Sequence, residues 1–296
     1  MARTLKDTLR LFRELKELKK NKEKIIPIFY DFRISETPRE AIKKIINTAR
    51  ENPALDDLLK ISKTQDLILK AEKEAEEKDW NYACEEFVRE TGVNYEIRGT
   101  ENVPERGGDL YVCNHPYGLL DAAALVGGLG SLLNKKGREL KIIATNQLRF
   151  IKGIEKKVYF VNSKIKKINS DSIKGALKYL DEGGDLAIYP AGKISKEGLK
   201  DYPWKNGSGI FIPHSYYVVP MWFSGPNHAK VYNFLAKFKK TEKLRGIFSL
   251  REAWNKAGET IVLNIGKPIR AEKLKEMRNN GERVQYLRQT AENLKI

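Results

Sequence analysis

The sequence predicts an α/β fold, in which a largely parallel or mixed central sheet of about seven strands is flanked by helices. Two observations predict it. From residue 93 onward, short apolar segments alternate with helical segments, a pattern typical of a largely parallel sheet. Before residue 91, apolar residues recur at helical spacing instead. We therefore divide the 296 residues into an N-terminal helical region (1–90) and an α/β domain (91–296).

The first helical signal is a basic amphipathic pattern near the start of the chain. Its apolar stripe consists of Leu5, Leu9 and Phe12, widened by Leu11, Leu15 and Leu18. Such a helix can lie in a membrane interface, or it can pack its stripe against the rest of the protein. The sequence leaves both alternatives open.

Two more helices are expected before the sheet begins. The segment Thr37-Pro-Arg-Glu40 is a capping box with proline at the first helical position, and an apolar stripe of Ile42, Ile45 and Ile46 follows it. A longer helix is expected from about residue 64 to residue 90, ending just before a glycine.

Seven short apolar segments of the α/β domain are expected to form strands. They span residues 93–98, 110–114, 140–144, 158–161, 185–189, 217–223 and 260–265. Helices are expected between most of them. The clearest helix covers residues 171–181 and ends in the pair Gly183-Gly184.

Composition narrows the class of protein. Hydrophobic residues make up 41% of the chain, enough for a sizeable core. The charged N-terminus predicts no signal peptide, and the longest apolar stretch, Leu110 to Leu133, contains His115 and Asp121 and is poorly suited to spanning a bilayer. The two cysteines form no paired motif and the three histidines lack helical spacing, so we expect a cytosolic protein without a metal site.

Half of the net charge of +16 lies in one segment of the chain. Residues 138–178 contain eleven basic residues against three acidic ones. Such a cluster attracts an anionic membrane surface, and the same field would attract nucleic acid. Because no nucleic-acid motif accompanies it, nucleic acid is the weaker alternative, and a lysine-rich composition without any partner is a third.

The segment Asp109-Leu-Tyr-Val-Cys-Asn-His-Pro-Tyr-Gly-Leu-Leu-Asp121 is the most informative part of the sequence. It delivers His115 and Asp121 from the end of a short apolar strand into a tight turn. Ligands of open α/β sheets bind in the crevice beyond the carboxyl ends of the strands. The pair is therefore a candidate general base with its orienting acid. The alternative is a turn histidine that bonds the backbone, followed by an aspartate that caps a helix.

Three further blocks follow in the chain. They are Leu186-Ala-Ile-Tyr-Pro-Ala-Gly-Lys-Ile-Ser195, then Asp201-Tyr-Pro-Trp204 with Val218-Val-Pro-Met-Trp-Phe-Ser-Gly-Pro-Asn227, and finally Ile265-Gly-Lys-Pro-Ile269. With the first segment, they resemble the glycerolipid acyltransferase superfamily over roughly residues 93–275. That superfamily usually has four residues between His and Asp. The five residues here resemble a bacterial branch often labelled hemolysin or lysophospholipid acyltransferase, which carries His-Pro-x-Gly-x-x-Asp.

The resemblance implies a site and a chemistry. His115 would remove the proton of an acceptor hydroxyl, while Asp121 would fix the tautomer of the imidazole and stabilise the imidazolium. Substrate is expected to contact Asn114, Gly118, Pro190, Ala191, Gly192 and Lys193. Backbone N–H groups around Gly118 or Gly192 are candidate donors to the oxyanion that forms on the thioester carbonyl.

The second block departs from its usual form, Phe-Pro-Glu-Gly-Thr-Arg-Ser. Ala191, Lys193 and Ile194 stand where Glu, Thr and Arg are common, so the arginine that suits a phosphomonoester is absent. Lysophosphatidate is therefore not expected to be strongly preferred, and a lyso-amino-acid lipid or another hydroxylated lysolipid fits the block equally well. An ordinary strand-ending turn is the alternative interpretation of Pro190 to Gly192.

The expected function is transfer of a fatty acyl chain from acyl-CoA or acyl carrier protein to the hydroxyl of a lysolipid, without a prosthetic group. The protein is expected to be cytoplasmic and peripheral on the inner face of the membrane. One alternative is a non-catalytic protein that binds an anionic membrane or nucleic acid. A second is a hydrolase, although Gly207-Ser208-Gly209 does not follow a strand as a nucleophile elbow would. Acceptor identity, acyl length, donor carrier and oligomeric state stay open.

Overall fold

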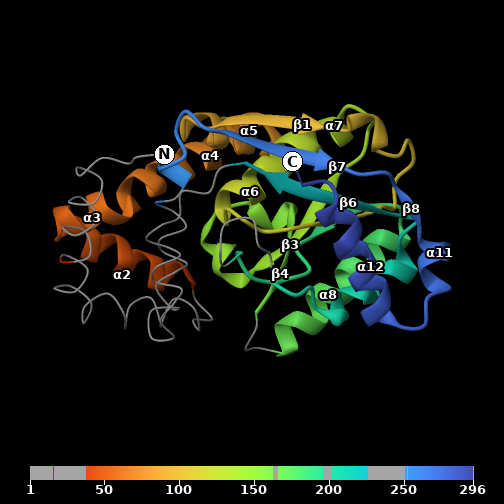
Figure 1. The fold of residues 1–296 in the computed structure, drawn as a ribbon. Helices are drawn as coiled ribbons and strands as arrows, with labels where there is room; N and C mark the ends of the chain where they lie inside the picture. The colour runs from red at the N-terminus through yellow and green to blue at the C-terminus, as the bar shows by residue number, and fades with distance from the viewer. Residues whose placement is uncertain are drawn as a thin grey trace.

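The structure is a computed structural model that describes residues 16, 38–162, 166–195, 202–225, 251 and 253–295. In this part of the chain, helices cover both faces of a mixed sheet (Figure 1). The basic amphipathic pattern at residues 5–18 and the first residue of the capping box, Thr37, lie outside the described residues, with the exception of residue 16.

The sheet has the order β1-β7-β6-β2-β5-β3-β4, and β8 pairs with β6. The strands are β1 (Asn94–Arg98), β2 (Leu110–Cys113), β3 (Leu140–Thr145), β4 (Val158–Val161), β5 (Asp185–Ile188), β6 (Tyr217–Ser224), β7 (Thr260–Ile265) and β8 (Ile269–Arg270). Neighbouring strands are parallel, except that β6 is antiparallel to β7 and β8. The predicted fold class and its seven strands are confirmed, each strand ending within one residue of expectation. The two-residue β8 was not expected.

Helices fill the connections and precede the sheet. They are α2 (Pro38–Arg50), α3 (Pro53–Leu59), α4 (Ile61–Glu77), α5 (Trp80–Glu90), α6 (Leu119–Ala124), α7 (Gly130–Asn134), α8 (Lys166–Asp181), α11 (Ala271–Lys275) and α12 (Asn280–Glu292). A π-helical turn, η2 (Leu125–Leu129), joins α6 to α7, and 3-10 segments occur at η1 (Thr100–Asn102), η3 (Asn146–Phe150), η4 (Ile154–Lys156) and η5 (Asn206–His214). Ser208 lies in the 3-10 segment η5.

The long helix expected over residues 64–90 is wrong in one respect, because the structure divides it into α4 and α5. The backbone of Lys78 leaves the helical region, and Asp79 caps the second helix by accepting a 2.8 Å hydrogen bond from the Tyr82 N–H. An aspartate side chain competes for backbone donors and so favours a helix start over a helix interior. The break lets Trp80 turn inward, where its indole N–H donates to the Gly153 carbonyl at 3.1 Å.

Two hydrophobic clusters lie on opposite faces of the sheet. Along β2, Tyr111 and Cys113 belong to one cluster while Leu110 and Val112 belong to the other, since successive side chains of a strand point to opposite faces. The first cluster packs α4 to α7 against the sheet, and the second packs α8, α11, α12 and η5. Figure 1 shows α5 on one side of the sheet and α8 and α12 on the other. All four residues of β2 are buried, as expected of a strand covered on both faces.

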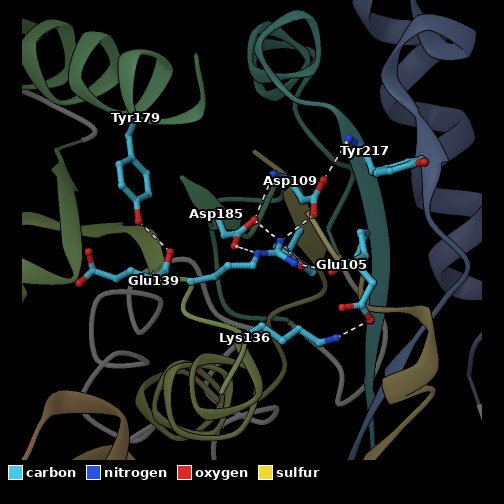
Figure 2. A network of polar contacts seen from close by, with 10 residues as sticks. Glu105, Asp109, Lys136, Glu139, Tyr179, Asp185 and Tyr217 are labelled. Atoms are coloured by element: carbon cyan, nitrogen blue, oxygen red, sulfur yellow. Dashed lines mark hydrogen bonds and ion pairs between the residues drawn. The ribbon is translucent and has the colours of Figure 1, made fainter. Parts of the chain in front are cut away.

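A buried ionic cluster joins the starts of β2 and β5 (Figure 2). The Arg138 guanidinium donates to Asp109 Oδ2 at 2.8 Å and to Asp185 at 2.6 and 2.8 Å. Asp109 also accepts from the Tyr217 N–H at 3.2 Å, which extends the cluster to the start of β6. Burial and the adjacent Asp185 carboxylate raise the pKa of Asp109 to about 6, and burial also raises the pKa of Asp185. These contacts link the starts of β2, β5 and β6, three strands that are far apart in the sequence.

A membrane-spanning helix, a disulfide and a metal site are all absent from the described residues. Among the described residues, no helix combines the length and apolar character needed to span a membrane. Cys84 in α5 and Cys113 in β2 are both buried, and no disulfide joins them. No cluster of metal-binding side chains occurs in the described part of the chain.

Candidate active site

His115 and Asp121 meet at the carboxyl end of β2. The Nδ1 atom of His115 lies 2.8 Å from Asp121 Oδ1, and the Asp121 side chain is fully buried while 18% of the His115 side chain is exposed. A buried carboxylate behind a partly exposed imidazole has the geometry of a base and its orienting acid. Because β2 runs from Asp109 toward His115, this pair lies at the opposite edge of the sheet from the ionic cluster of Figure 2.

The turn between the two residues fixes this geometry. The Tyr117 N–H donates to the other carboxylate oxygen, Asp121 Oδ2, at 2.7 Å. Gly118 follows with φ 72° and ψ −121°, a conformation that strongly favours glycine, and α6 begins at the next residue. Five intervening residues can therefore fold back so that Asp121, in the first turn of α6, faces His115. Asp121 is not the N-cap residue, because that position is Gly118.

The side chain of Asn114 is hydrogen-bonded to the backbone of β6. Its side-chain oxygen accepts from the Phe223 N–H at 2.7 Å, and its amide nitrogen donates to the Phe223 carbonyl at 3.0 Å. The side chain is fully buried. Both polar ends of the amide are therefore engaged, and Asn114 ties the end of β2 to β6 directly beside His115.

The second block lies against the histidine. The Tyr189 ring stacks on the His115 ring with centroids 4.2 Å apart and an interplanar angle of 19°. The Ser195 N–H donates to the His115 carbonyl at 2.7 Å. Two segments separated by more than seventy residues thus form one site, since β5 lies beside β2 in the sheet.

The turn of Pro190, Ala191 and Gly192 shapes the edge of this site. Ala191 is buried, and Gly192 has φ 61°, where a side chain would be strained. The Gly192 N–H already donates to the Tyr189 carbonyl at 2.8 Å. The Gly192 N–H itself is therefore not a ready oxyanion donor, and the other amides around Gly118 and Gly192 stay candidates.

Lys193 is exposed at the end of the same turn. Its ammonium nitrogen lies 5.5 Å from the centroid of the Tyr202 ring, within the range of a cation–π contact. Lys205 also reaches this turn, because its backbone N–H donates to the Pro190 carbonyl at 3.1 Å. With the contacts of Tyr189 and Ser195 to His115, the structure places the second block beside His115 and Asp121.

Sequence reasoning missed two side chains at the site. Tyr189 was visible as the aromatic residue before Pro190, at the position of the phenylalanine in the usual second block, but its stacking on His115 carried no sequence signal. Lys205 lies outside every block. Its proximity to Gly192 depends on the path of the chain between them.

Burial keeps the phenols near the histidine neutral. The pKa of Tyr189 is raised well above its usual value by burial and by the nearby Asp121 carboxylate, and the same two causes raise the pKa of Tyr117. The Tyr189 hydroxyl is buried and has no hydrogen-bond partner among the described residues. Tyr189 therefore contacts His115 through its ring, and its hydroxyl makes no polar contact in this part of the structure.

Comparisons with known proteins identify the family. The Acyltransferase family model matches residues 94–224. The lyso-glycine lipid O-acyltransferase of Phocaeicola vulgatus is 31% identical to this chain over 206 residues, which cover 64% of this chain and 68% of that protein. The chain belongs to the glycerolipid acyltransferase superfamily. This acyltransferase is also 28% identical over 202 residues to the lyso-glycine lipid O-acyltransferase of Bacteroides thetaiotaomicron, covering 64% of this chain and 70% of that protein.

A solved structure is also similar to this acyltransferase. The 1-acyl-sn-glycerophosphate (LPA) acyltransferase PlsC of Thermotoga maritima covers 96% of both chains with a TM-score of 0.47 and 16% identity. The family resemblance expected from the four blocks is confirmed by the family model and the two relatives. The protein is an O-acyltransferase of lipid metabolism.

Proposed function

We propose that this O-acyltransferase moves a fatty acyl chain from a thioester, acyl-CoA or acyl carrier protein, to the hydroxyl of a lysolipid. His115 is the general base and Asp121 its orienting partner. The observation that carries this proposal is the 2.8 Å contact between His115 Nδ1 and Asp121 Oδ1 at the carboxyl edge of β2. Since Nδ1 faces the carboxylate, Nε2 is the ring atom that takes the proton of the acceptor.

The proposed reaction has two steps and needs no prosthetic group. The acceptor oxygen attacks the thioester carbonyl as its proton passes to Nε2 of His115, giving a tetrahedral oxyanion and an imidazolium beside Asp121. The oxyanion then collapses, the C–S bond breaks, and the proton leaves Nε2 for the departing thiolate. The products are an ester and a free thiol. General-base catalysis supplies about 10²- to 10⁴-fold, and positioning and oxyanion stabilisation supply the remainder.

For the acceptor, we propose a lyso-amino-acid lipid. Both relatives are named for a lyso-glycine lipid. In this chain Ile194 stands where arginine is common in the second block, which removes a bidentate contact suited to a phosphomonoester. Lysophosphatidate is therefore not expected to be strongly preferred over a lysolipid that lacks a terminal phosphate.

The decisive experiment is an acyl-transfer assay with labelled donors and a panel of lysolipids, with products identified by mass spectrometry. We expect a new ester whose formation requires both a thioester and a lysolipid. Release of free fatty acid at the same rate with and without an acceptor would instead identify a hydrolase. A specificity constant for lysophosphatidate about 100-fold above the others, near 2.7 kcal/mol, would reject the proposed acceptor class.

The ring of Tyr189 is expected to hold the imidazole of His115 in its reactive plane. Tyr189→Leu removes the stacked ring, so we expect kcat to fall by about tenfold, or roughly 1.4 kcal/mol, with little change in KM. Tyr189→Phe keeps the ring and removes only the unpartnered hydroxyl, so it should retain kcat. Steady-state kinetics of both variants test this. Equal kcat in the leucine variant and the wild type would contradict the positioning role.

We also propose that the protein binds anionic membrane surfaces peripherally, supported by its net charge of +16. Part of the basic cluster at residues 138–178 is already committed, because Arg138 lies in the buried ionic cluster and Lys157 contacts Glu139 at 3.0 Å. Co-sedimentation should show binding that increases with the anionic lipid content of vesicles and decreases with salt. Equal binding to neutral and anionic vesicles would reject the electrostatic account.

A further inference from the structure

We propose that Lys193 and Lys205 form a subsite for the carboxylate of the acceptor headgroup, beside the His115 base. The inference rests on the proposed function and deepens it, because it assigns the residues that select the acceptor. It commits to a headgroup with a free carboxylate, such as glycine joined to its lipid through the amino group.

The position of Lys205 is the first observation. The chain carries no side chain at Gly192, and a Cβ atom there would lie only 2.7 Å from the Lys205 ammonium nitrogen. The ammonium group therefore lies directly against the Gly192 backbone. The hydrogen bond from the Lys205 N–H to the Pro190 carbonyl anchors this lysine to the turn of the second block.

The turn of Pro190, Ala191 and Gly192 is held against His115 by contacts on both of its sides. Tyr189, which precedes it, stacks on His115, and Ser195, which follows it, donates to the His115 carbonyl. Lys193 lies between these two contacts, and Lys205 contacts the glycine beside it. A headgroup held by the two lysines would therefore lie next to the imidazole that receives the proton of the acceptor hydroxyl.

The electrostatic state of the two lysines is the second observation. Both side chains are exposed, and neither makes an ion pair with any residue that the structure describes. The ring of Tyr202 faces Lys193 but carries no charge to neutralise it. Two ammonium groups at one turn attract an anion, and as compact point charges they bind a carboxylate without the flat bidentate fork that arginine offers to phosphate.

The test uses two acceptors that differ only in headgroup charge. One is a lyso-glycine lipid with a free carboxylate, and the other is the same lipid as its neutral primary amide. We expect the wild type to prefer the acid in kcat/KM, and Lys205→Met to reduce the acid-to-amide ratio by about tenfold. Lys193→Met should reduce the ratio in the same direction, and Lys205→Arg, which keeps the charge, should restore most of it.

Lys273→Met is the matched control. Lys273 is an exposed lysine of α11, the helix that follows β8. Because β8 pairs with the start of β6, Lys273 lies at the opposite edge of the sheet from His115. It should leave both the rates and the ratio unchanged. An unchanged ratio in both Lys205→Met and Lys193→Met would overturn the subsite. A wild type that prefers lysophosphatidate over both glycine lipids, with that preference lost in Lys205→Met, would overturn the assignment to a carboxylate. If the wild type acylates none of these acceptors, the proposed function itself fails.

Discussion

Replacing His115 with alanine is expected to lower the rate of acyl transfer by about 10²- to 10⁴-fold, the range that a general base contributes. Without the imidazole, the acceptor hydroxyl would have to lose its proton to water. The loss should appear in kcat, because the proposed role of the side chain is to receive a proton in the transition state and not to bind the lipid chain. Initial rates with a labelled thioester donor and a lysolipid acceptor measure it.

His214 offers a matched control for this variant. It also contacts an aspartate, with Nδ1 2.9 Å from Asp181 Oδ1, but it precedes β6 and so lies at the opposite edge of the sheet from His115. His214→Ala should therefore keep full activity. Circular dichroism should show both variants folded, since the His115 side chain lies at a strand exit and is not part of the hydrophobic core.

Asp121 completes this test. Asp121→Asn keeps an oxygen that can accept from the Tyr117 N–H but removes the charge that stabilises the imidazolium. A loss comparable to that of His115→Ala is expected. Full turnover in Asp121→Asn would mean that the carboxylate only holds the turn, and that His115 acts without it.

The second large effect concerns stability. Arg138→Met is expected to lower the free energy of unfolding by about 3–5 kcal/mol, because it leaves Asp109 and Asp185 buried without a counter-charge. Urea denaturation followed by tryptophan fluorescence measures it. Arg89→Met is the control: Arg89 pairs with Glu86 and Glu90 of the same helix, α5, and 67% of its own side chain is exposed. Removing such a surface pair should cost less than about 1 kcal/mol.

The effect of Arg138→Met should depend on pH. In the folded wild type the pKa of Asp109 is about 6, above the ordinary value of 3.8. A carboxyl whose pKa is raised by folding contributes stability that is fully present below the ordinary pKa and is lost as the pH rises through the folded value. Arg138 lowers the pKa values of Asp109 and Asp185 in the wild type, so removing it raises both further. The deficit of the variant should therefore be larger at about pH 8 than at about pH 5, where protonation of its carboxyl groups removes buried charge. A deficit independent of pH would contradict this account.

The agreement between sequence and structure is close where the signal is local. The strands were predictable because a buried parallel strand is a short apolar run, and β2 and β5 are such runs between turn residues. The His115 and Asp121 pair was predictable because both residues lie in one segment whose Pro and Gly mark the turn. The division between α4 and α5 was missed because the helical apolar pattern continues across it, although the cap that makes it is a single aspartate.

The sequence by itself determined the α/β class, the family, most of the elements and the pairing of His115 with Asp121, since each can be read from short segments of the chain. Only the tertiary structure decided which distant residues meet. In the fold, Tyr189 stacks on His115, and the Lys205 ammonium lies against Gly192. Arg138 links Asp109 to Asp185. The physical reason is that these contacts follow from strand order and from the course of the loops. Strand order is set by the burial of whole faces of the sheet, and no single segment carries that information.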